Sequence, residues 1–424
     1  MNNDELQVLG SEKKQQKNNK VKITIIALVA LLAVGAGICY YATSPKQPEK
    51  IKTGKKMGEP TIVPELQAAV DSMLNDELTE INGLQGQVIV MEVQTGEILA
   101  MSGLERNFEG KFQPCKNFGY QQELGSAMMT ASLLASLESG KVKLNDIVHT
   151  GLGVEHVGDE MFMKDHNWRR GGYGSITLDR AIEVSSNIGI SQAVARAYGS
   201  NPQAFFDQLN KMGFGQPDYI EGIGGLKPSS YSCPKDSDWV NWKLWWSAIG
   251  YERKIAPIQM LTFYNAIANN GKMVKPTLKT GEMEIINPQI ASKANIDSMQ
   301  VVLEHVVSQG LGRKAGTPLL LVAGKTGTSH VGEYSEGDNI VNEYQLAFCG
   351  YFPADAPKYS IIVSLNKLGL PASGGGMAGV VFHNIVEWMI THSMPPVLFL
   401  DEETNDTIRI TPNNVDSIMT SSNK

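Results

Sequence analysis

Apolar and polar positions follow several patterns along this chain, and the first is a single long apolar run. Residues 23–41 are almost all apolar, about 19 residues in a row, which is long enough to cross a bilayer. The run ends at Tyr40 and Tyr41, as an aromatic pair at a membrane interface would. A cleaved signal peptide is the alternative, but its apolar region usually covers only about 7–15 residues. We therefore predict an uncleaved transmembrane anchor over residues 23–43.

The segments beside the predicted anchor are polar and rich in lysine. Residues 1–22 are predicted to form a tail and residues 44–60 a linker of Lys, Pro and Gly. A folded domain is expected over 61–392, with a second tail over 393–424. Lysines stand on both sides of the anchor, so the positive-inside rule does not fix its orientation.

Beyond residue 61 the pattern changes to alternating helical and strand-like segments. Residues 63–78 have helical periodicity, and 87–92 with 97–101 read as a hairpin around Thr95 and Gly96. Apolar residues on nearly all faces of 126–137 predict a central buried helix that follows Gly125. Further helices are expected at 176–197 (broken near 185–189), 203–212, 257–270, 296–308 and 380–391. Further strands are expected at 319–325, 344–352 and 359–365, with a short one at 397–400.

Composition limits the classes of function. The chain has 424 residues, 42% of them hydrophobic and 19% charged, which describes a globular protein. Its net charge of -7, without a basic stripe interleaved with aromatics, gives no reason to expect nucleic acid as a partner.

The candidate metal ligands and cysteines lack the spacing of a metal site. Four cysteines (Cys39, Cys115, Cys233 and Cys349) include no CxxC pair, and Cys115 with Cys233 is the only disulfide worth testing. A region over 145–174 that reads as loops holds His156, Asp159, Glu160, Asp165 and His166 without a metal-binding pattern. We interpret these five as solvated loop residues and expect no metal and no cofactor.

The segment 322–329 carries the first candidate chemistry. It contains Gly324-Lys325-Thr326, but a phosphate-binding loop would need a glycine five positions before Gly324, where Leu319 stands. A strand edge offered to a ligand fits better: Gly327 would leave the backbone open, Lys325 would supply a positive charge, and Thr326 and Thr328 would supply hydroxyls. An ordinary strand and turn is the alternative on this segment alone.

Together with two upstream motifs, this segment resembles the transpeptidase domain of penicillin-binding proteins, nearest to the monofunctional class B group. The similarity runs through 87–100, Gly125-Ser126, 185–189, 255–276, 322–329 and 350–357. The resemblance implies an α/β penicillin-binding/β-lactamase-like fold, behind one N-terminal transmembrane helix. In that fold an antiparallel sheet of about five strands is flanked by helices and joined by an all-helical subdomain. Class B members usually carry a large module between anchor and transpeptidase domain, which is too long for residues 44–60.

The resemblance also implies a serine acyl-transfer site. The nucleophile of its S-x-x-K motif maps onto Ser126, and the S-x-N motif maps onto Ser185 and Asn187. The K-T-G motif maps onto Lys325, Thr326 and Gly327, and would bind the carboxylate of a peptide or β-lactam. The backbone N–H groups of Ser126 and Thr328 would form an oxyanion hole, which typically contributes about 3–4 kcal/mol.

One position departs from the family pattern. Met129 stands where the family has the lysine of S-x-x-K, and residues i and i+3 share a helix face. A thioether accepts no proton at neutral pH, and a general base typically contributes about 10²–10⁴ in rate. Lys325 is the best substitute base, although it is already assigned to the ligand carboxylate. Lys116 and the seven histidines have weaker claims.

Two hypotheses remain open. The first is an active D,D-transpeptidase or carboxypeptidase acylated on Ser126, since the other motif residues are retained. The second, which we prefer because of Met129, is a protein that binds stem peptides or β-lactams with weak or no turnover. A β-lactam sensor or hydrolase ranks behind both, since these also depend on the lysine.

Location and partners follow from the resemblance. Peptidoglycan lies outside the cytoplasmic membrane, so the domain after residue 44 is expected to face outward, on a single-pass anchor with residues 1–22 inside. A membrane glycosyltransferase, or division or elongation proteins, would be partners of such a domain. No nucleic acid is expected.

Overall fold

The computed structural model describes residues 57–158, 161–215, 220–224, 226–227, 229–336, 339–392, 394, 398–400 and 407–409. The chain divides into two compact units, Met1–Lys55 and Lys56–Lys424, and every described residue lies in the second. Among the described residues, no helix has the length and apolarity needed to span a membrane. The predicted anchor over 23–43 lies outside them.

A six-stranded antiparallel sheet organises the second unit. Its order is β12-β13-β14-β1-β2-β3. The strands are β1 (Gly83–Glu92), β2 (Ile98–Arg106), β3 (Phe112–Pro114), β12 (Ala323–Glu336), β13 (Asn339–Phe352) and β14 (Tyr359–Leu368). The expected antiparallel sheet of about five strands is thus confirmed, with the three-residue β3 as an added edge.

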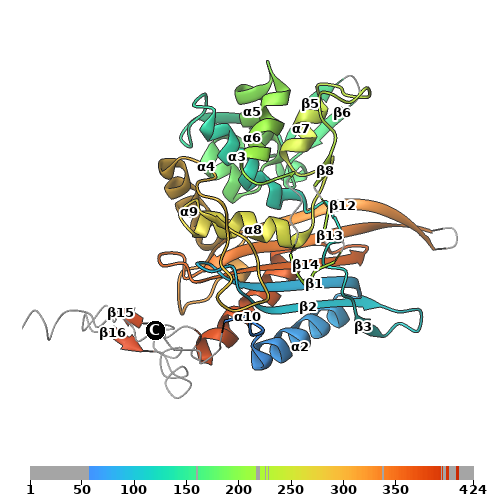
Figure 1. Cartoon of the computed structure of the whole chain (residues 1–424). Helices are drawn as coiled ribbons and strands as arrows, with labels where there is room; N and C mark the ends of the chain where they lie inside the picture. The colour runs from blue at the N-terminus through green and yellow to red at the C-terminus, as the bar shows by residue number, and fades with distance from the viewer. Residues whose placement is uncertain are drawn as a thin grey trace, which may run out of the picture. The chain divides into compact units, whose positions relative to one another are not determined.

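Both faces of the central strand β1 are covered, because alternate side chains enter two different cores. Val88 and Val90 pack in a core with α2 (Pro64–Glu80) and α10 (Gly379–Thr391). Ile89 and Met91 pack in the other core, with the helices on the opposite side of the sheet. Successive strand residues point to opposite faces, so a run without polar interruption is what a doubly covered strand requires. Figure 1 shows α2 and α10 on one side and α8 and α9 on the other.

The helical region lies on the α8 side of the sheet (Figure 1). Its helices are α3 (Met129–Glu138), preceded by the 3-10 turn η1 (Gly125–Met128), and α4 (Leu178–Glu183), α5 (Asn187–Tyr198), α6 (Pro202–Lys211) and α7 (Lys243–Ala248). It is not purely helical, which corrects one expectation. Two-stranded sheets join β4 (Ile147–Gly151) to β7 (Gly174–Thr177) and β5 (Val154–Gly158) to β6 (Met161–Lys164). The region over 145–174, read as loops from the sequence, therefore supplies β4, β5, β6 and the first residue of β7.

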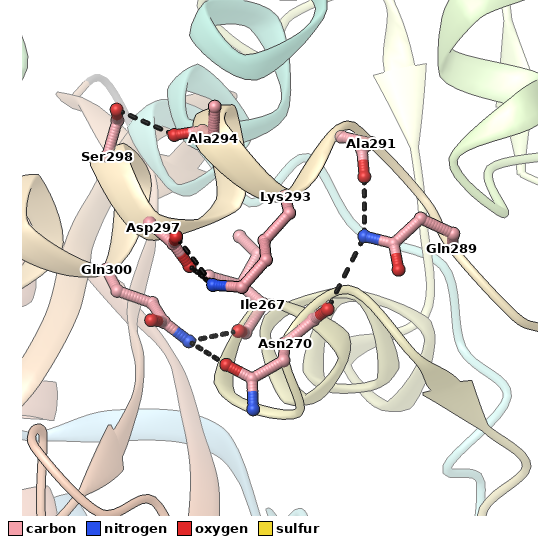
Figure 2. Close-up of polar contacts among 9 residues, drawn as sticks. All are labelled: Ile267, Asn270, Gln289, Ala291, Lys293, Ala294, Asp297, Ser298 and Gln300. Atoms are coloured by element: carbon pink, nitrogen blue, oxygen red, sulfur yellow. Dashed lines mark hydrogen bonds and ion pairs between the residues drawn. The ribbon is translucent and has the colours of Figure 1, made fainter.

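Helices α8 (Pro257–Ala268) and α9 (Lys293–Ser308) are tied together where α8 ends. Gln300 on α9 donates to the carbonyl of Ile267 at 2.8 Å and to Asn270 Oδ1 at 3.4 Å (Figure 2). In the same view, Gln289 donates to the carbonyls of Asn270 and Ala291, which holds the segment entering α9. These contacts hold the end of α8, a helix that positions the candidate site.

The remaining elements are short. They are η2 (Trp168–Arg170), β8 (Ser230–Tyr231), β9 (Arg253–Lys254), β10 (Met273–Val274), β11 (Ile285–Asn287), η3 (Arg313–Ala315), the π-helical turn η4 (Gly374–Ala378), β15 (Leu398–Leu400) and β16 (Thr407–Arg409). The short strand expected at 397–400 agrees with β15. Cys115, Cys233 and Cys349 are free thiols, so the Cys115–Cys233 disulfide is not formed.

The strand expected at 319–325 is misplaced. β12 begins at Ala323 and continues to Glu336, pairing with β13 over its length, and Leu321 is half exposed before it. The polar residues after Gly327 belong to this long hairpin, which extends past the other strands in Figure 1. Apolar periodicity marks the buried start of such a ribbon and misses the part that leaves the core.

Candidate active site

A cavity of about 370 Å³ opens where the helical region meets β12. Five of the predicted site residues line it: Ser126, Ser185, Asn187, Thr326 and Thr328. The structure thus brings three distant motifs to one pocket. The other lining residues are His166, Ile249, Tyr251, Leu311 and residues 372–375.

Two glycines allow the segment bearing Ser126 to lie directly on β12. Gly125 has a φ of +55°, and a Cβ there would lie 2.7 Å from the carbonyl oxygen of Thr328. A Cβ at Gly327 would clash with the carbonyl oxygen of Leu124. Gly327 was expected to leave room for a ligand, but the room is taken by the chain around Ser126.

Tyr264 of α8 holds η1, the turn that carries Ser126, in place through hydrogen bonds. Its hydroxyl donates to the carbonyl of Ala127 at 2.8 Å and lies 2.7 Å from Thr130 Oγ1. Ala127, Thr130 and Tyr264 are all buried, so these hydrogen bonds are shielded from water. Rotation of the helix about its axis would break them, and Ser126 is therefore held facing the cavity.

The second motif is held by a buried carboxylate. Ser186, beside Ser185, donates to Asp165 Oδ2 at 2.8 Å, and the backbone N–H of Ile188 donates to Asp165 Oδ1 at 3.1 Å. Asp165 is fully buried at the N-terminus of α5, where a negative charge is favourable. The interpretation of Asp165 as a solvated loop residue is therefore wrong. Burial raises its pKa, and these hydrogen bonds lower it in part.

Ser185 and Asn187, on either side of Ser186, form hydrogen bonds with different partners. Ser185 has a φ of +54°, a left-handed conformation that is uncommon outside glycine and is often found at functional sites. Asn187 Nδ2 donates to the carbonyl of Lys164 at 2.8 Å. The amide orientation of Asn187 is thereby set by the β6 strand.

Lys325 lies behind the cavity wall, fully buried. Its Nζ donates to Ser185 Oγ at 2.8 Å and to the Thr326 carbonyl at 3.0 Å. Burial lowers the pKa of Lys325 to about 7. Lys325 therefore reaches the cavity through Ser185 and Thr326, whereas the sequence led us to expect its charge to be offered directly to the ligand carboxylate.

Met129 contacts the same Ser185 hydroxyl oxygen as Lys325 does. Its side chain is fully buried, and Ser185 Oγ donates to Met129 Sδ at 3.6 Å. Among the described residues, Ser126 Oγ has no hydrogen-bond partner. A thioether is a weak acceptor, so the Ser126 hydroxyl has no basic group beside it from α3.

Family comparison places these motifs in a known group. The model of the penicillin-binding protein transpeptidase domain matches residues 86–387, which is most of the chain. The chain belongs to the penicillin-binding protein transpeptidase family.

Several relatives of this transpeptidase domain are known. Penicillin-binding protein PbpB of Mycobacterium tuberculosis is 26% identical over 378 residues, covering 80% of this chain and 53% of the relative. Stage V sporulation protein D of Bacillus subtilis is 27% identical over 332 residues, covering 70% and 48%. Peptidoglycan D,D-transpeptidase FtsI of Escherichia coli is 24% identical over 325 residues, covering 74% and 52%. The chain spans about half the length of these relatives.

Solved structures share the fold of this transpeptidase domain. The apo domain of penicillin-binding protein 3 from Burkholderia pseudomallei has a TM-score of 0.65 at 25% identity, covering 77% of this chain and 94% of that one. Penicillin-binding protein 3 of Mycobacterium tuberculosis complexed with aztreonam has a TM-score of 0.66 at 24% identity, covering 80% and 81%.

Sequence reasoning missed or misinterpreted several residues that line the cavity. His166, interpreted from the sequence as a solvated loop residue, is one of them. Its Nε2 lies 3.0 Å from the Tyr173 hydroxyl, and burial lowers the pKa of the imidazole below its ordinary value. The loop 369–376 is held by Lys367, which donates to the carbonyls of Gly369 and Pro371. The run Gly374-Gly375-Gly376 was a visible signal, since consecutive glycines mark close backbone approach.

The described residues of the transpeptidase domain contain no cluster of three or more His, Cys, Asp or Glu side chains that could hold a metal ion. The chemistry available at the cavity comes from hydroxyls, one amide, one imidazole and the buried amine of Lys325.

Proposed function

We propose that this chain is a penicillin-binding protein of peptidoglycan synthesis that binds stem peptides or β-lactams at the Ser126 cavity, with weak or no turnover. Weak or no turnover is proposed because of one observation, the 3.6 Å contact between Met129 Sδ and Ser185 Oγ. A thioether stands where a proton acceptor is needed, and unactivated serine is a weak nucleophile. Family membership and relatives named as peptidoglycan D,D-transpeptidases support the first half.

A second candidate is an active D,D-transpeptidase or carboxypeptidase that uses Lys325 as its base through Ser185. Its support is the 2.8 Å contact between Lys325 Nζ and Ser185 Oγ, together with a pKa near 7. At neutral pH about half of such an amine is unprotonated, and a neutral amine can accept a proton.

The setting of the domain is part of the proposal. Residues 1–22 would be cytoplasmic, 23–43 would form a single transmembrane helix and 44–60 a linker. The domain over 61–392, with its tail over 393–424, would then lie outside the cytoplasmic membrane. A cell-wall glycosyltransferase or division proteins would be partners in the membrane. The hydropathy of residues 23–41 and the nature of peptidoglycan as the substrate support this arrangement.

Intact-mass analysis after incubation with benzylpenicillin tests the main proposal on the full-length protein. We expect little or no adduct on the unmodified protein, none on Ser126→Ala, and a stoichiometric adduct on Met129→Lys. Met129→Leu is the matched control, because it keeps the volume without adding a proton acceptor. A stoichiometric adduct on the unmodified protein, lost in Ser126→Ala, would overturn weak turnover and favour the second candidate.

A further inference from the structure

A second cavity of about 430 Å³ adjoins the Ser126 cavity. The two share Leu311, Ser373 and Gly375 as lining residues, so they are neighbours across one wall. Each has the size of a small-ligand site. A ligand that extends from the Ser126 cavity over this wall would enter the second one.

The second cavity differs from the first in carrying permanent positive charge. Arg313 and Lys314 of η3 line it, beside Met377 and Leu311. Both cationic side chains are exposed, and neither forms an ion pair with another described residue. An arginine left unpaired in a concave site is suited to a carboxylate, which it can bind through two parallel N–H groups.

The two cations are not equivalent. Lys314 lies near Glu77 of α2: burial raises the pKa of Glu77 to about 7, Glu80 adds to the rise, and the charge of Lys314 opposes it. Lys314 thus already interacts with a carboxylate of this protein, that of Glu77 on α2. Arg313 forms no ion pair with a described residue, and its charge remains available to a ligand.

We propose that this second cavity is a subsite for a carboxylate-bearing side chain of the peptide whose C-terminal end occupies the Ser126 cavity, with Arg313 as the residue that binds the carboxylate. The inference rests on the proposed function, because it assumes a peptide in the first cavity. It adds a preference: among peptides with the same terminal residues, acidic ones bind more tightly than their amides.

The test uses two matched pairs of peptides on the full-length protein with Ser126→Ala, so that no acylation disturbs the equilibrium. N-acetyl-Glu-D-Ala-D-Ala is compared with its Gln counterpart, and a homologue with a side chain two methylenes longer is compared with its amide. Isothermal titration at low salt is expected to give about three- to tenfold tighter binding for the acid of at least one pair. Arg313→Gln is expected to remove the difference and leave the affinity for the amides unchanged.

Controls separate this inference from the function on which it rests. Lys111→Gln removes a distant, exposed cation and is expected to keep the preference. If all peptides bind but the acids gain nothing, or if the gain survives Arg313→Gln, the subsite is overturned and the proposed function stands. If no peptide binds at all, the proposed function fails and the subsite fails with it.

Discussion

At the scale of single residues, the hydroxyl of Ser185 lies between a cation and a sulfur. Lys325 Nζ donates to its oxygen at 2.8 Å, and its own proton points to Met129 Sδ at 3.6 Å. Sulfur is a weak acceptor, so this proton is easily turned toward a better one. When the amine of Lys325 is neutral it is a better acceptor than the sulfur. The pH therefore determines whether Lys325 donates a hydrogen bond to Ser185 or accepts one from it.

The pKa of Lys325 therefore predicts how ligand binding depends on pH. Burial lowers that pKa to about 7, so Lys325 is mostly an ammonium at pH 6 and mostly neutral at pH 8. If the ammonium assists a ligand carboxylate, the affinity of the Ser126→Ala protein for N-acetyl-D-Ala-D-Ala falls up to about tenfold over this range. Titration calorimetry at each pH measures it.

The matched control is the same dipeptide with a C-terminal amide, whose affinity is expected to stay constant over this range. A flat profile for the acid as well would mean that Lys325 does not act on the ligand carboxylate. In the active alternative the observable differs: the rate of adduct formation on Ser126 rises with pH through about 7, because the neutral amine is the base.

At the scale of elements, the junction of α4 and α5 depends on one carboxylate from outside both helices. Asp165 follows β6 and binds Ser186 and the N–H of Ile188. Ser185 sits between these helices in a left-handed conformation, which nothing in its own side chain favours. The conformation of Ser185 is maintained because Asp165 holds the residues that follow it, Ser186 and Ile188, by hydrogen bonds.

We expect Asp165→Ala to lower the free energy of unfolding by about 2–3 kcal/mol, because it leaves a buried hydroxyl and a buried N–H without their acceptor. Urea unfolding measures this loss. Asp165→Asn keeps one carbonyl acceptor and should lose less, and Glu109→Ala on the exposed β2–β3 hairpin should lose almost nothing. Equal stability of Asp165→Ala and Glu109→Ala would show that the carboxylate does not hold the junction.

At the scale of the whole molecule, the sequence predicted the parts that obey one periodicity. Strand β1 could be predicted because its side chains pack in two cores, one on each face of the sheet, and are therefore apolar throughout. The helix after Gly125 could be predicted because it is enclosed in one core and is apolar on nearly all faces. Residues 330–334 of β12, which are mostly exposed, show no such periodicity. The second cavity escaped too, since Arg313 and Gly375 are brought together only by the tertiary structure.

The sheet order predicts which truncations the fold tolerates. β1 pairs with β14 along its length, as in Val88 opposite Val363, whereas β15 and β16 pair, among the described strands, only with each other. A chain that ends at residue 355 is expected to be insoluble or rapidly degraded by trypsin. A chain that ends at residue 396 should keep its melting temperature within about 2 °C. Soluble, protease-resistant protein from the shorter chain would contradict the importance of the β1–β14 pairing.

The pairing of β1 with β14 also sets an order of events during synthesis. A chain is made from its N-terminus, and pairing between distant segments waits until both have been made. β2 can join β1 early, since a short turn connects them, but the other edge of β1 stays open until residues 359–368 emerge. The central strand of the finished sheet therefore spends most of translation half paired, with apolar side chains on both faces.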